Sequence, residues 1–334
     1  MKESDIRDRE TFTRYLKLAA KEVKDFFWDP GRFTAVPCVA CASRRFRAQF
    51  EKIGFRYVLC DDCGTLYANP RPPKEDLVAF NTTSKTAEVL SSEIIGSMAE
   101  RRREEIFRPR AELAAKRLAG RSSGVLGDIG AGAGLFLEEM RKIMPRARLT
   151  AIEPSQEMAA ICRKKGFEVI DRAIEDVDRQ EARFDLLTAF ELLEHLHEPK
   201  VLFRSAHEML KPGGLFLMTT LNCEGFDIQV LWGDSKNIYP AQHINFFNPM
   251  SIRMALENAG FRIEELTTPG RLDWDIVENA IKDSTGQPGR LWENFAKNAR
   301  SEAKEALQLF LSRHGLSSHM MVLARKVERD SPHG

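Results

Sequence analysis

The spacing of hydrophobic and polar positions changes character near residue 124. Before that point, apolar residues recur at helical spacing over residues 4–28 and again over 74–119. After it, short apolar runs alternate with helical stretches, a pattern typical of a parallel sheet with crossover helices. We therefore predict an α/β fold, with strands at 125–129, 148–152, 168–170, 185–189, 215–220, 261–267 and 319–324.

The same pattern divides the 334-residue chain into segments. We expect an N-terminal helix within 1–32, a small separate module at 33–73, a helical region at 74–123, an α/β domain at 124–326 and a tail at 327–334. A mostly helical segment, residues 268–316, lies between the last two strands of that domain. An insertion of this length is either a lid over a substrate or a contact between subunits of an oligomer.

Composition and charge exclude several classes of protein. With 43% hydrophobic and 30% charged residues, the chain has the make-up of a folded soluble protein. A net charge of +1 gives no reason to expect a nucleic-acid or membrane-surface partner. No run of about 18 apolar residues occurs, and the first residues are charged where a signal peptide needs an apolar segment. The prediction is a cytoplasmic protein without membrane insertion.

Four of the six cysteines fall into two close pairs. Cys38 and Cys41 are separated by two residues, as are Cys60 and Cys63, and the pairs lie eighteen residues apart. This spacing matches four-thiolate zinc sites, in which each pair occupies a tight turn and no coordination position stays open. The pattern favours a structural zinc over the alternative, four ordinary buried cysteines.

A glycine-rich loop follows the first predicted strand of the α/β domain. It contains Asp128, Gly130, Gly132 and Gly134, and glycines at such a turn let the backbone approach a ligand closely. Glu153 ends the next predicted strand, where a carboxylate can accept both hydroxyls of a ribose. The order of residues differs from the G-x-G-x-x-G loop of nicotinamide enzymes, and an acid at its head suits a cationic or amino-bearing ligand. These residues indicate a nucleoside cofactor.

With these motifs in this order, residues 124–326 resemble class I S-adenosylmethionine-dependent methyltransferases. The resemblance implies a Rossmann-like sheet of seven strands with an antiparallel last strand. It also implies that the loop from Asp128 to Gly134 holds the methionine part of the cofactor, that Glu153 binds the ribose, and that Glu175 and Asp176 lie by the adenine.

The N-terminal module resembles a narrower group. A zinc ribbon followed by Leu-Tyr-Ala-Asn-Pro-Arg-Pro-Pro at 66–73, ahead of this fold, is similar to bacterial methyltransferases of sugar, polysaccharide and secondary-metabolite pathways. That resemblance implies a small-molecule or sugar acceptor.

An acid and histidine cluster follows the fourth predicted strand. If a helix begins there, Glu191, Glu194 and His195 share one face, and the distant His243 can complete a site for magnesium, manganese or zinc. The pattern resembles metal-assisted O-methyltransferases of ubiquinone biosynthesis and of the terminal ribose of small RNAs. Two alternatives stay open: His195 or His197 acts as a metal-free general base, or these residues are structural.

The predicted function is transfer of a methyl group from S-adenosylmethionine to a hydroxyl of a sugar, a polysaccharide precursor or a related polar metabolite. Three alternatives remain: methylation of carbon or nitrogen in such a metabolite, methylation of RNA, and a non-catalytic binding role. The intact Asp128 loop and Glu153 argue against the last of these.

Overall fold

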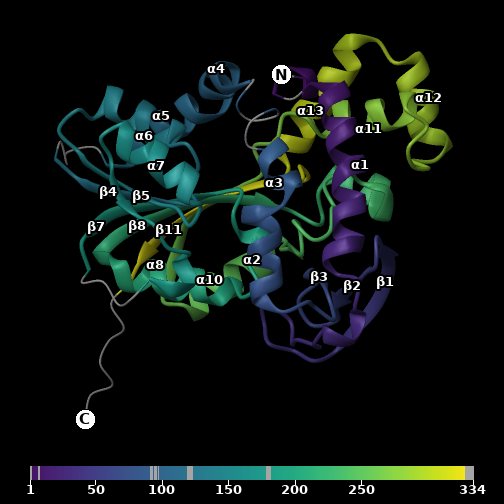
Figure 1. Ribbon diagram of the computed structural model, residues 1–334. Helices are drawn as coiled ribbons and strands as arrows, with labels where there is room; N and C mark the ends of the chain where they lie inside the picture. Colours follow the sequence, from purple (N-terminus) through teal and green to yellow (C-terminus); the bar gives the residue numbers. More distant parts are fainter. Residues whose placement is uncertain are drawn as a thin grey trace.

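Two β-sheets organise the fold, which is known from a computed structural model (Figure 1). The structure describes residues 2–6, 8–90, 93, 96, 98–118, 123–177 and 182–327. The predicted tail therefore lies, from residue 328 on, outside the described residues.

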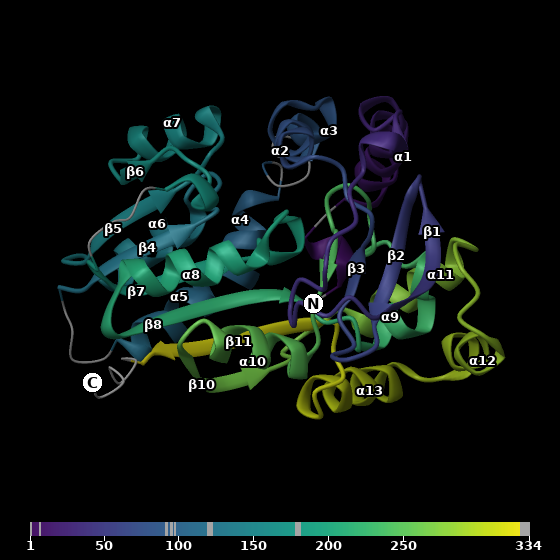
Figure 2. The ribbon, with the colours of Figure 1, turned by 90° about the horizontal axis from the view of Figure 1, so that it is seen from below.

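The large sheet has seven strands in the order β10-β11-β8-β7-β4-β5-β6 (Figure 2). Strand β11 is antiparallel to both of its neighbours, whereas the pairs among β4 to β8 are parallel. The predicted fold class is therefore confirmed. The strands are β4 (Val125–Ile129), β5 (Arg148–Ile152), β6 (Glu168–Ile170), β7 (Phe184–Phe190), β8 (Leu210–Leu221), β10 (Phe261–Thr267) and β11 (His319–Lys326).

Helices cover both faces of this sheet. In Figure 1, α5 to α7 lie on one face and α8 and α10 on the other. A central strand such as β7 is consequently buried on both faces, and its residues are buried continuously up to Phe190 rather than in alternation. The helices are α5 (Arg108–Arg117), α6 (Leu135–Ile143), α7 (Gln156–Lys164), α8 (Pro199–Met209) and α10 (Pro249–Asn258).

The small sheet is separate from the large one, and one of its strands comes from outside residues 33–73. It is antiparallel, with β1 (Phe46–Lys52), β2 (Phe55–Cys60), β3 (Leu66–Ala68) and, as its fourth strand, β9 (Asn245–Phe246). Leu66 pairs with Phe246 and Tyr67 with Asn245. Residues 33–73 alone thus do not complete the sheet, because the edge of β3 is covered by a segment from the α/β part of the chain. We call residues 33–73 the four-cysteine module.

Further helices and turns lie in the part of the chain before the large sheet. Helix α1 begins after Asp8, whose carboxylate accepts from the Thr11 amide at 2.8 Å, and it buries one helical face. These helices and turns are η1 (Glu3–Asp5), α1 (Arg9–Phe26), η2 (Pro30–Arg32), α2 (Lys74–Thr83), α3 (Lys85–Val89), α4 (Ala99–Arg102) and the π-helical η4 (Arg103–Phe107).

The insertion between β10 and β11 is helical, as predicted. Its helices are α11 (Asp273–Lys282), α12 (Arg290–Asn298) and α13 (Ser301–Arg313), and α11 packs against α9 (Phe226–Leu231). Trp274 and Val277 are buried with Leu231 in a small core of their own. The remaining turns are η5 (Ile174–Asp176), η6 (Leu193–His195) and η7 (Trp232–Asp234).

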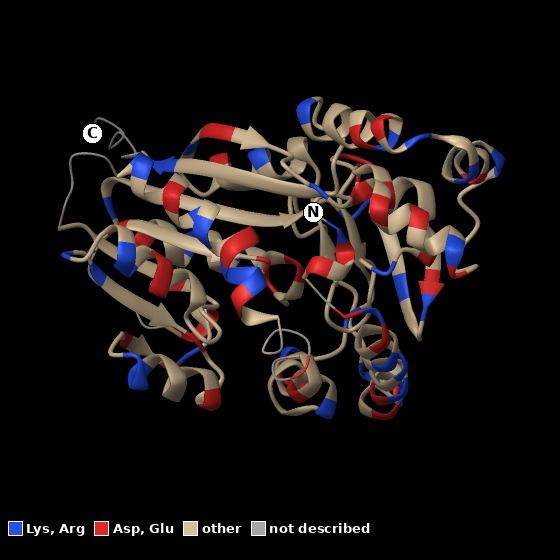
Figure 3. Ribbon diagram, turned by 90° about the horizontal axis from the view of Figure 1, so that it is seen from above, with Lys and Arg blue, Asp and Glu red and all other residues tan. Residues whose placement is uncertain are grey.

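Basic and acidic residues are interspersed over the elements drawn in Figure 3. Within the described ranges, none of the helices combines the length and hydrophobicity that crossing a bilayer requires.

Candidate functional site

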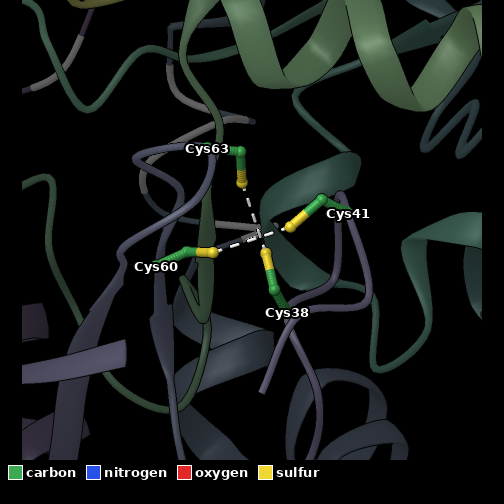
Figure 4. Close-up of side chains that lie close together, drawn as sticks. All are labelled: Cys38, Cys41, Cys60 and Cys63. Atoms are coloured by element: carbon green, nitrogen blue, oxygen red, sulfur yellow. Dashed lines mark hydrogen bonds between the residues drawn. The ribbon is translucent and has the colours of Figure 1, made fainter. Parts of the chain in front are cut away.

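The four paired cysteines point toward one another (Figure 4). Cys38 and Cys41 lie in the loop before β1, Cys60 ends β2, and Cys63 lies in the turn before β3. The Sγ atoms of Cys38 and Cys63 are 3.5 Å apart, and those of Cys41 and Cys60 are 3.6 Å apart. Four thiolates around zinc, each at about 2.3 Å, lie about 3.8 Å from one another. Donor set and spacing therefore fit a closed structural zinc site.

The glycine-rich loop leaves β4 in a conformation that needs its glycines. Gly130, Gly132 and Gly134 have φ values of 72°, 52° and 74°, in the left-handed region that other residues rarely adopt. A side-chain carbon at Gly132 would meet nothing within 4 Å, so open space lies beside the loop there. One at Gly130 would lie 3.3 Å from Leu192, which places the loop against the turn after β7.

Two acids lie under this loop. Glu153 accepts from the Gly132 amide at 2.8 Å and from the Ser155 amide at 2.9 Å. Asp128 accepts from the Thr188 hydroxyl at 2.6 Å, and burial raises its pKa to about 7. Positive charge brought to this place would favour the ionised form of Asp128. The buried acid and the open space beside Gly132 fit a cationic nucleoside cofactor.

The segment expected beside the adenine, with Glu175 and Asp176, lies next to α2. Glu175 Oε1 is buried and has no hydrogen-bond partner in the structure, and burial raises the pKa of this carboxyl group. Asp176 is exposed and lies 3.0 Å from the Lys74 ammonium. An orphaned buried acceptor at Glu175 fits a ligand that donates a hydrogen bond.

The turn after β7 is not the helix on which the shared face of Glu191, Glu194 and His195 depended. Glu191 has a left-handed φ of 50°, and its amide donates to the Thr219 carbonyl at 3.0 Å, so it still follows the sheet. A single 3₁₀ turn, η6, comes after it. The expected i, i+3, i+4 face is therefore wrong.

A different set of residues comes together. One ligand atom each of Glu194, His195 and His243 lies within 4.8 Å of the others, and within the described residues Glu191 and His197 do not join this group. We call these three residues the carboxylate–histidine cluster. The rings of the two histidines are 4.9 Å apart. Two nitrogens and one carboxylate oxygen form a donor set that suits a divalent cation.

The cluster residues are held by hydrogen bonds. Glu194 accepts from the Thr220 hydroxyl at 2.9 Å, and burial, followed by the charge of Glu191, raises its pKa. His243 Nδ1 lies 2.6 Å from the Asn237 carbonyl oxygen, which assigns the proton to this nitrogen. The lone pair is then on Nε2, the arrangement commonly found when histidine binds a metal.

Glu191 lies instead on the wall of a neighbouring pocket. Its carboxylate accepts from Arg110 at 2.8 Å and from the Thr219 hydroxyl at 2.6 Å, and it lies 3.4 Å from His319 Nε2. Burial of the Glu191 carboxyl group by itself would raise its pKa. The neighbouring His319 and Arg110 have a larger effect, and the pKa of Glu191 is lowered. The Arg110 guanidinium also stacks 4.7 Å over the ring of Phe190. Glu191 is thus a fixed anion at the end of β7.

This pocket, which we call the α5 pocket, has a volume of about 460 Å³. Such a volume is in the range of about 300–1,000 Å³ that is usual for small-molecule sites. Helix α5, the end of β8, the start of β11 and the start of the insertion contribute to its wall. Residues important for its chemistry are Arg110, Glu191, Thr219, Asp227, Asp273 and His319.

Among these wall residues sequence reasoning predicted a role only for Glu191, and His319 and Arg110 are two of those that it missed. His319 was not singled out from the sequence, although the antiparallel β11 must begin at the edge where the parallel strands end. That topology was a usable signal. For Arg110 the sequence holds no such signal, because only the packing of α5 on the sheet brings its guanidinium to Glu191.

Comparison with known proteins identifies the family. The model of a methyltransferase domain matches residues 98–266, about half of the chain. The protein therefore belongs to this family of S-adenosylmethionine-dependent methyltransferases, and the predicted enzyme class is confirmed.

Two individual relatives match part of the chain. A ubiquinone biosynthesis O-methyltransferase of Xanthomonas axonopodis pv. citri (strain 306) is 30% identical over 171 residues, which are 47% of this chain and 70% of that protein. One from Xanthomonas euvesicatoria pv. vesicatoria (strain 85-10) is 29% identical over 42% of this chain and 63% of that protein, less than two thirds of its length. Each of these relatives thus matches less than half of this chain.

A solved structure shares the fold. A chain of the complex between the Haloferax volcanii Trm112 methyltransferase activator and a methyltransferase matches with a TM-score of 0.50. The match covers 72% of this chain and 99% of that one at 14% identity. At so low an identity the likeness shows the fold alone.

Replacing Glu153 tests the cofactor site. We expect Glu153→Ala to weaken S-adenosylmethionine binding by about 1–3 kcal/mol, because a charged hydrogen-bond acceptor is lost. Calorimetric titration measures the affinity. Glu157→Ala is the matched control, since Glu157 is an exposed glutamate four residues further on. Equal affinities of the Glu153 variant and the unchanged protein would show that Glu153 does not bind the cofactor.

Proposed function

We propose that this methyltransferase acts on a hydroxyl oxygen of a small polar acceptor, with a divalent cation held by the carboxylate–histidine cluster. The observation that carries the proposal is the convergence of Glu194, His195 and His243, from two segments far apart in sequence, to within 4.8 Å. The two relatives reported above are named O-methyltransferases, which supports oxygen as the methylated atom.

The chain's own residues have distinct roles toward the cofactor. We assign the methionine part to the loop with Asp128, Gly130, Gly132 and Gly134, the ribose to Glu153, and the adenine side to Glu175 and Asp176. Bound S-adenosylmethionine supplies a methyl group on a positively charged sulfur. A cation bound beside Asp128 would favour the ionised form of this residue, and Glu153 is oriented by two backbone amides.

The cluster supplies the second part of the chemistry. A divalent cation held by Glu194, His195 and His243 would bind an acceptor hydroxyl and lower its pKa. The carbonyl of Asn237 keeps His243 in the required tautomer. Because β4 and β7 are adjacent and parallel, the glycine loop and the cluster share one edge of the sheet, where a short methyl transfer can take place.

The α5 pocket is proposed as the acceptor site. Leu221, Ile276 and Met321 give it apolar surface, and Glu191, Asp227 and His319 offer hydrogen-bonding groups. This combination suits a sugar, a polysaccharide precursor or a related metabolite with several hydroxyls. The insertion supplies Asp273 to the wall, which supports a lid role for residues 268–316 over an oligomer contact.

The four-cysteine site is proposed to hold structural zinc, on the geometry of Cys38, Cys41, Cys60 and Cys63. Its four thiolates leave no open position for a substrate. Reaction chemistry is therefore assigned to the edge of the large sheet.

The test of the proposed function is the identity of the methylated atom. The protein, with S-adenosylmethionine carrying a ¹³C-labelled methyl group, is incubated with nucleotide sugars, catechols, amines and a short RNA. Carbon NMR then distinguishes methyl groups on oxygen, nitrogen and carbon by their chemical shifts. We expect labelled O-methyl products from hydroxylated small molecules. Transfer only to nitrogen, carbon or RNA would contradict the proposal.

A further inference from the structure

The segment between the four-cysteine site and α2 contains a completely buried arginine that the proposed chemistry does not use. Arg71 is fully buried and donates to four oxygen atoms. Its Nε donates to the Ala68 carbonyl at 2.9 Å and its Nη1 to the His197 carbonyl at 2.7 Å. Its Nη2 donates to the Ile244 carbonyl at 3.2 Å and to Asn245 Oδ1 at 2.5 Å. One side chain thus joins β3, the turn after β7 and β9.

The acceptors of Arg71 are themselves tied to the carboxylate–histidine cluster. Asn245, also fully buried, donates its amide hydrogens to the Leu193 carbonyl at 3.0 Å and the Leu196 carbonyl at 2.7 Å. The Ile244 amide donates to the Glu194 carbonyl at 2.8 Å. These bonds fix the turn that carries Glu194 and His195 against the segment that carries His243.

A second residue of the four-cysteine module reaches the cluster directly. The Tyr57 hydroxyl donates to the His243 carbonyl at 2.8 Å. Tyr57 lies in β2, three residues before the zinc-site residue Cys60, and is fully buried. The main chain of His243 is therefore held from the strand that also presents a cysteine of the metal site.

We propose that Arg71 and Tyr57 are positioning residues for the carboxylate–histidine cluster, and that the four-cysteine module acts in catalysis by holding His243 and Glu194 at ligand distance. This inference rests on the proposed function of the cluster. A catalytic metal site must be kept within about 0.5 Å of its working geometry by supporting residues. Here the ligands come from two loops, so hydrogen bonds from a third segment must supply that support.

The contacts explain why the residue is arginine. A guanidinium has five N–H donors in a planar fork, and Arg71 uses them on acceptors in three separate segments. A lysine has its donors on a single nitrogen, so it cannot reach these positions at once. Arg71→Lys therefore keeps the charge but loses the connection.

Two tyrosines provide a matched pair of variants. Tyr57→Phe and Tyr67→Phe each remove one hydroxyl from a fully buried tyrosine on neighbouring strands of the same sheet. Only the Tyr57 hydroxyl donates to His243, whereas the Tyr67 hydroxyl has no hydrogen-bond partner in the structure. Arg71→Lys is the variant with the larger expected effect, and the pair remains informative if that variant does not fold.

Three measurements on the full chain, with zinc content verified in every sample, test the inference. Hydrogen–deuterium exchange reports on the amides around Glu194 and Ile244. Titration with Mn²⁺ alone, followed by electron paramagnetic resonance, reports on the cluster. Binding of S-adenosylhomocysteine reports on the glycine loop. A residue with only a general role in stability would not lower Mn²⁺ affinity while leaving cofactor-product affinity unchanged.

We expect Tyr57→Phe to speed exchange at Ile244 and to weaken Mn²⁺ binding by about fivefold each, the effect of one lost hydrogen bond. Arg71→Lys should speed exchange at Ile244 and weaken Mn²⁺ binding by at least about tenfold each, since several hydrogen bonds are lost. Tyr67→Phe should change neither, and S-adenosylhomocysteine affinity should stay constant in all three variants.

The outcomes separate this inference from the proposed function. Equal effects of the two tyrosine variants, or unchanged exchange in a folded Arg71→Lys protein, would overturn the positioning role. If the unchanged protein binds no Mn²⁺, the cation role of the cluster fails. Exchange at Ile244 then still decides whether Arg71 and Tyr57 hold this segment.

Discussion

Removing the divalent cation from the carboxylate–histidine cluster is expected to abolish methyl transfer while S-adenosylmethionine still binds. The cation acts on the acceptor hydroxyl, whereas the cofactor is held by the glycine loop and Glu153. Several kcal/mol of transition-state stabilisation would be lost, which corresponds to a decrease in rate of about a hundredfold or more. Activity assays before and after chelation measure the loss, and added magnesium, manganese or zinc should restore activity.

Two controls make this result specific. Zinc at Cys38, Cys41, Cys60 and Cys63 must still be present after chelation, because its removal would also inactivate the protein. His243→Ala should reproduce the loss without any chelator, whereas His314→Ala, which changes an exposed histidine after α13, should leave activity unchanged. Full activity of a chelated enzyme with intact zinc would eliminate the cation and favour a histidine base.

The second large effect is expected at the four-cysteine site. Cys60→Ser should lose the zinc and unfold the four-cysteine module. Structural zinc contributes an apparent binding free energy of about 10–16 kcal/mol at neutral pH, and small zinc modules depend on it to fold. Because β3 pairs with β9, the segment with His243 loses its support, and methyl transfer should fall with the zinc.

Metal analysis and limited proteolysis check this prediction. The unchanged protein should contain one zinc per chain, and the variant much less, with new cleavage sites within residues 33–73. Cys223→Ser is the matched control, since Cys223 is a buried cysteine whose thiol donates to the Gly64 carbonyl but does not belong to the sulfur cluster. A Cys60→Ser protein with stoichiometric zinc and unchanged proteolysis would contradict a zinc-dependent module.

Several features of the candidate site were predictable because their signals are local. The left-handed glycines at 130, 132 and 134 and the acid at the end of the next strand are set by backbone conformation and strand order. Cys38, Cys41, Cys60 and Cys63 follow a spacing that brings pairs of sulfurs onto tight turns. His243 was named as a distant partner of His195, and the structure places their rings 4.9 Å apart.

Other features were out of reach because they depend on packing between distant segments. The helix expected at Glu191 does not form, since the Glu191 amide still pairs with β8. Glu191 therefore faces Arg110 and His319 rather than the cluster. Nothing in the spacing of residues 66–73 shows that Arg71 reaches Ile244 and Asn245.

The sequence by itself determined the class of fold, the positions of the large sheet's strands along the chain, the cofactor loop and the cysteine pairs, because each depends on the hydrophobic period or on residues close together in the chain. Only the tertiary structure decided which acids and histidines meet, and that β9 completes the small sheet. Those contacts join residues that are far apart in the chain: Glu194 and His243 are 49 positions apart, and Tyr57 and His243 are 186 apart. Their geometry follows from how whole elements pack, which local spacing does not encode.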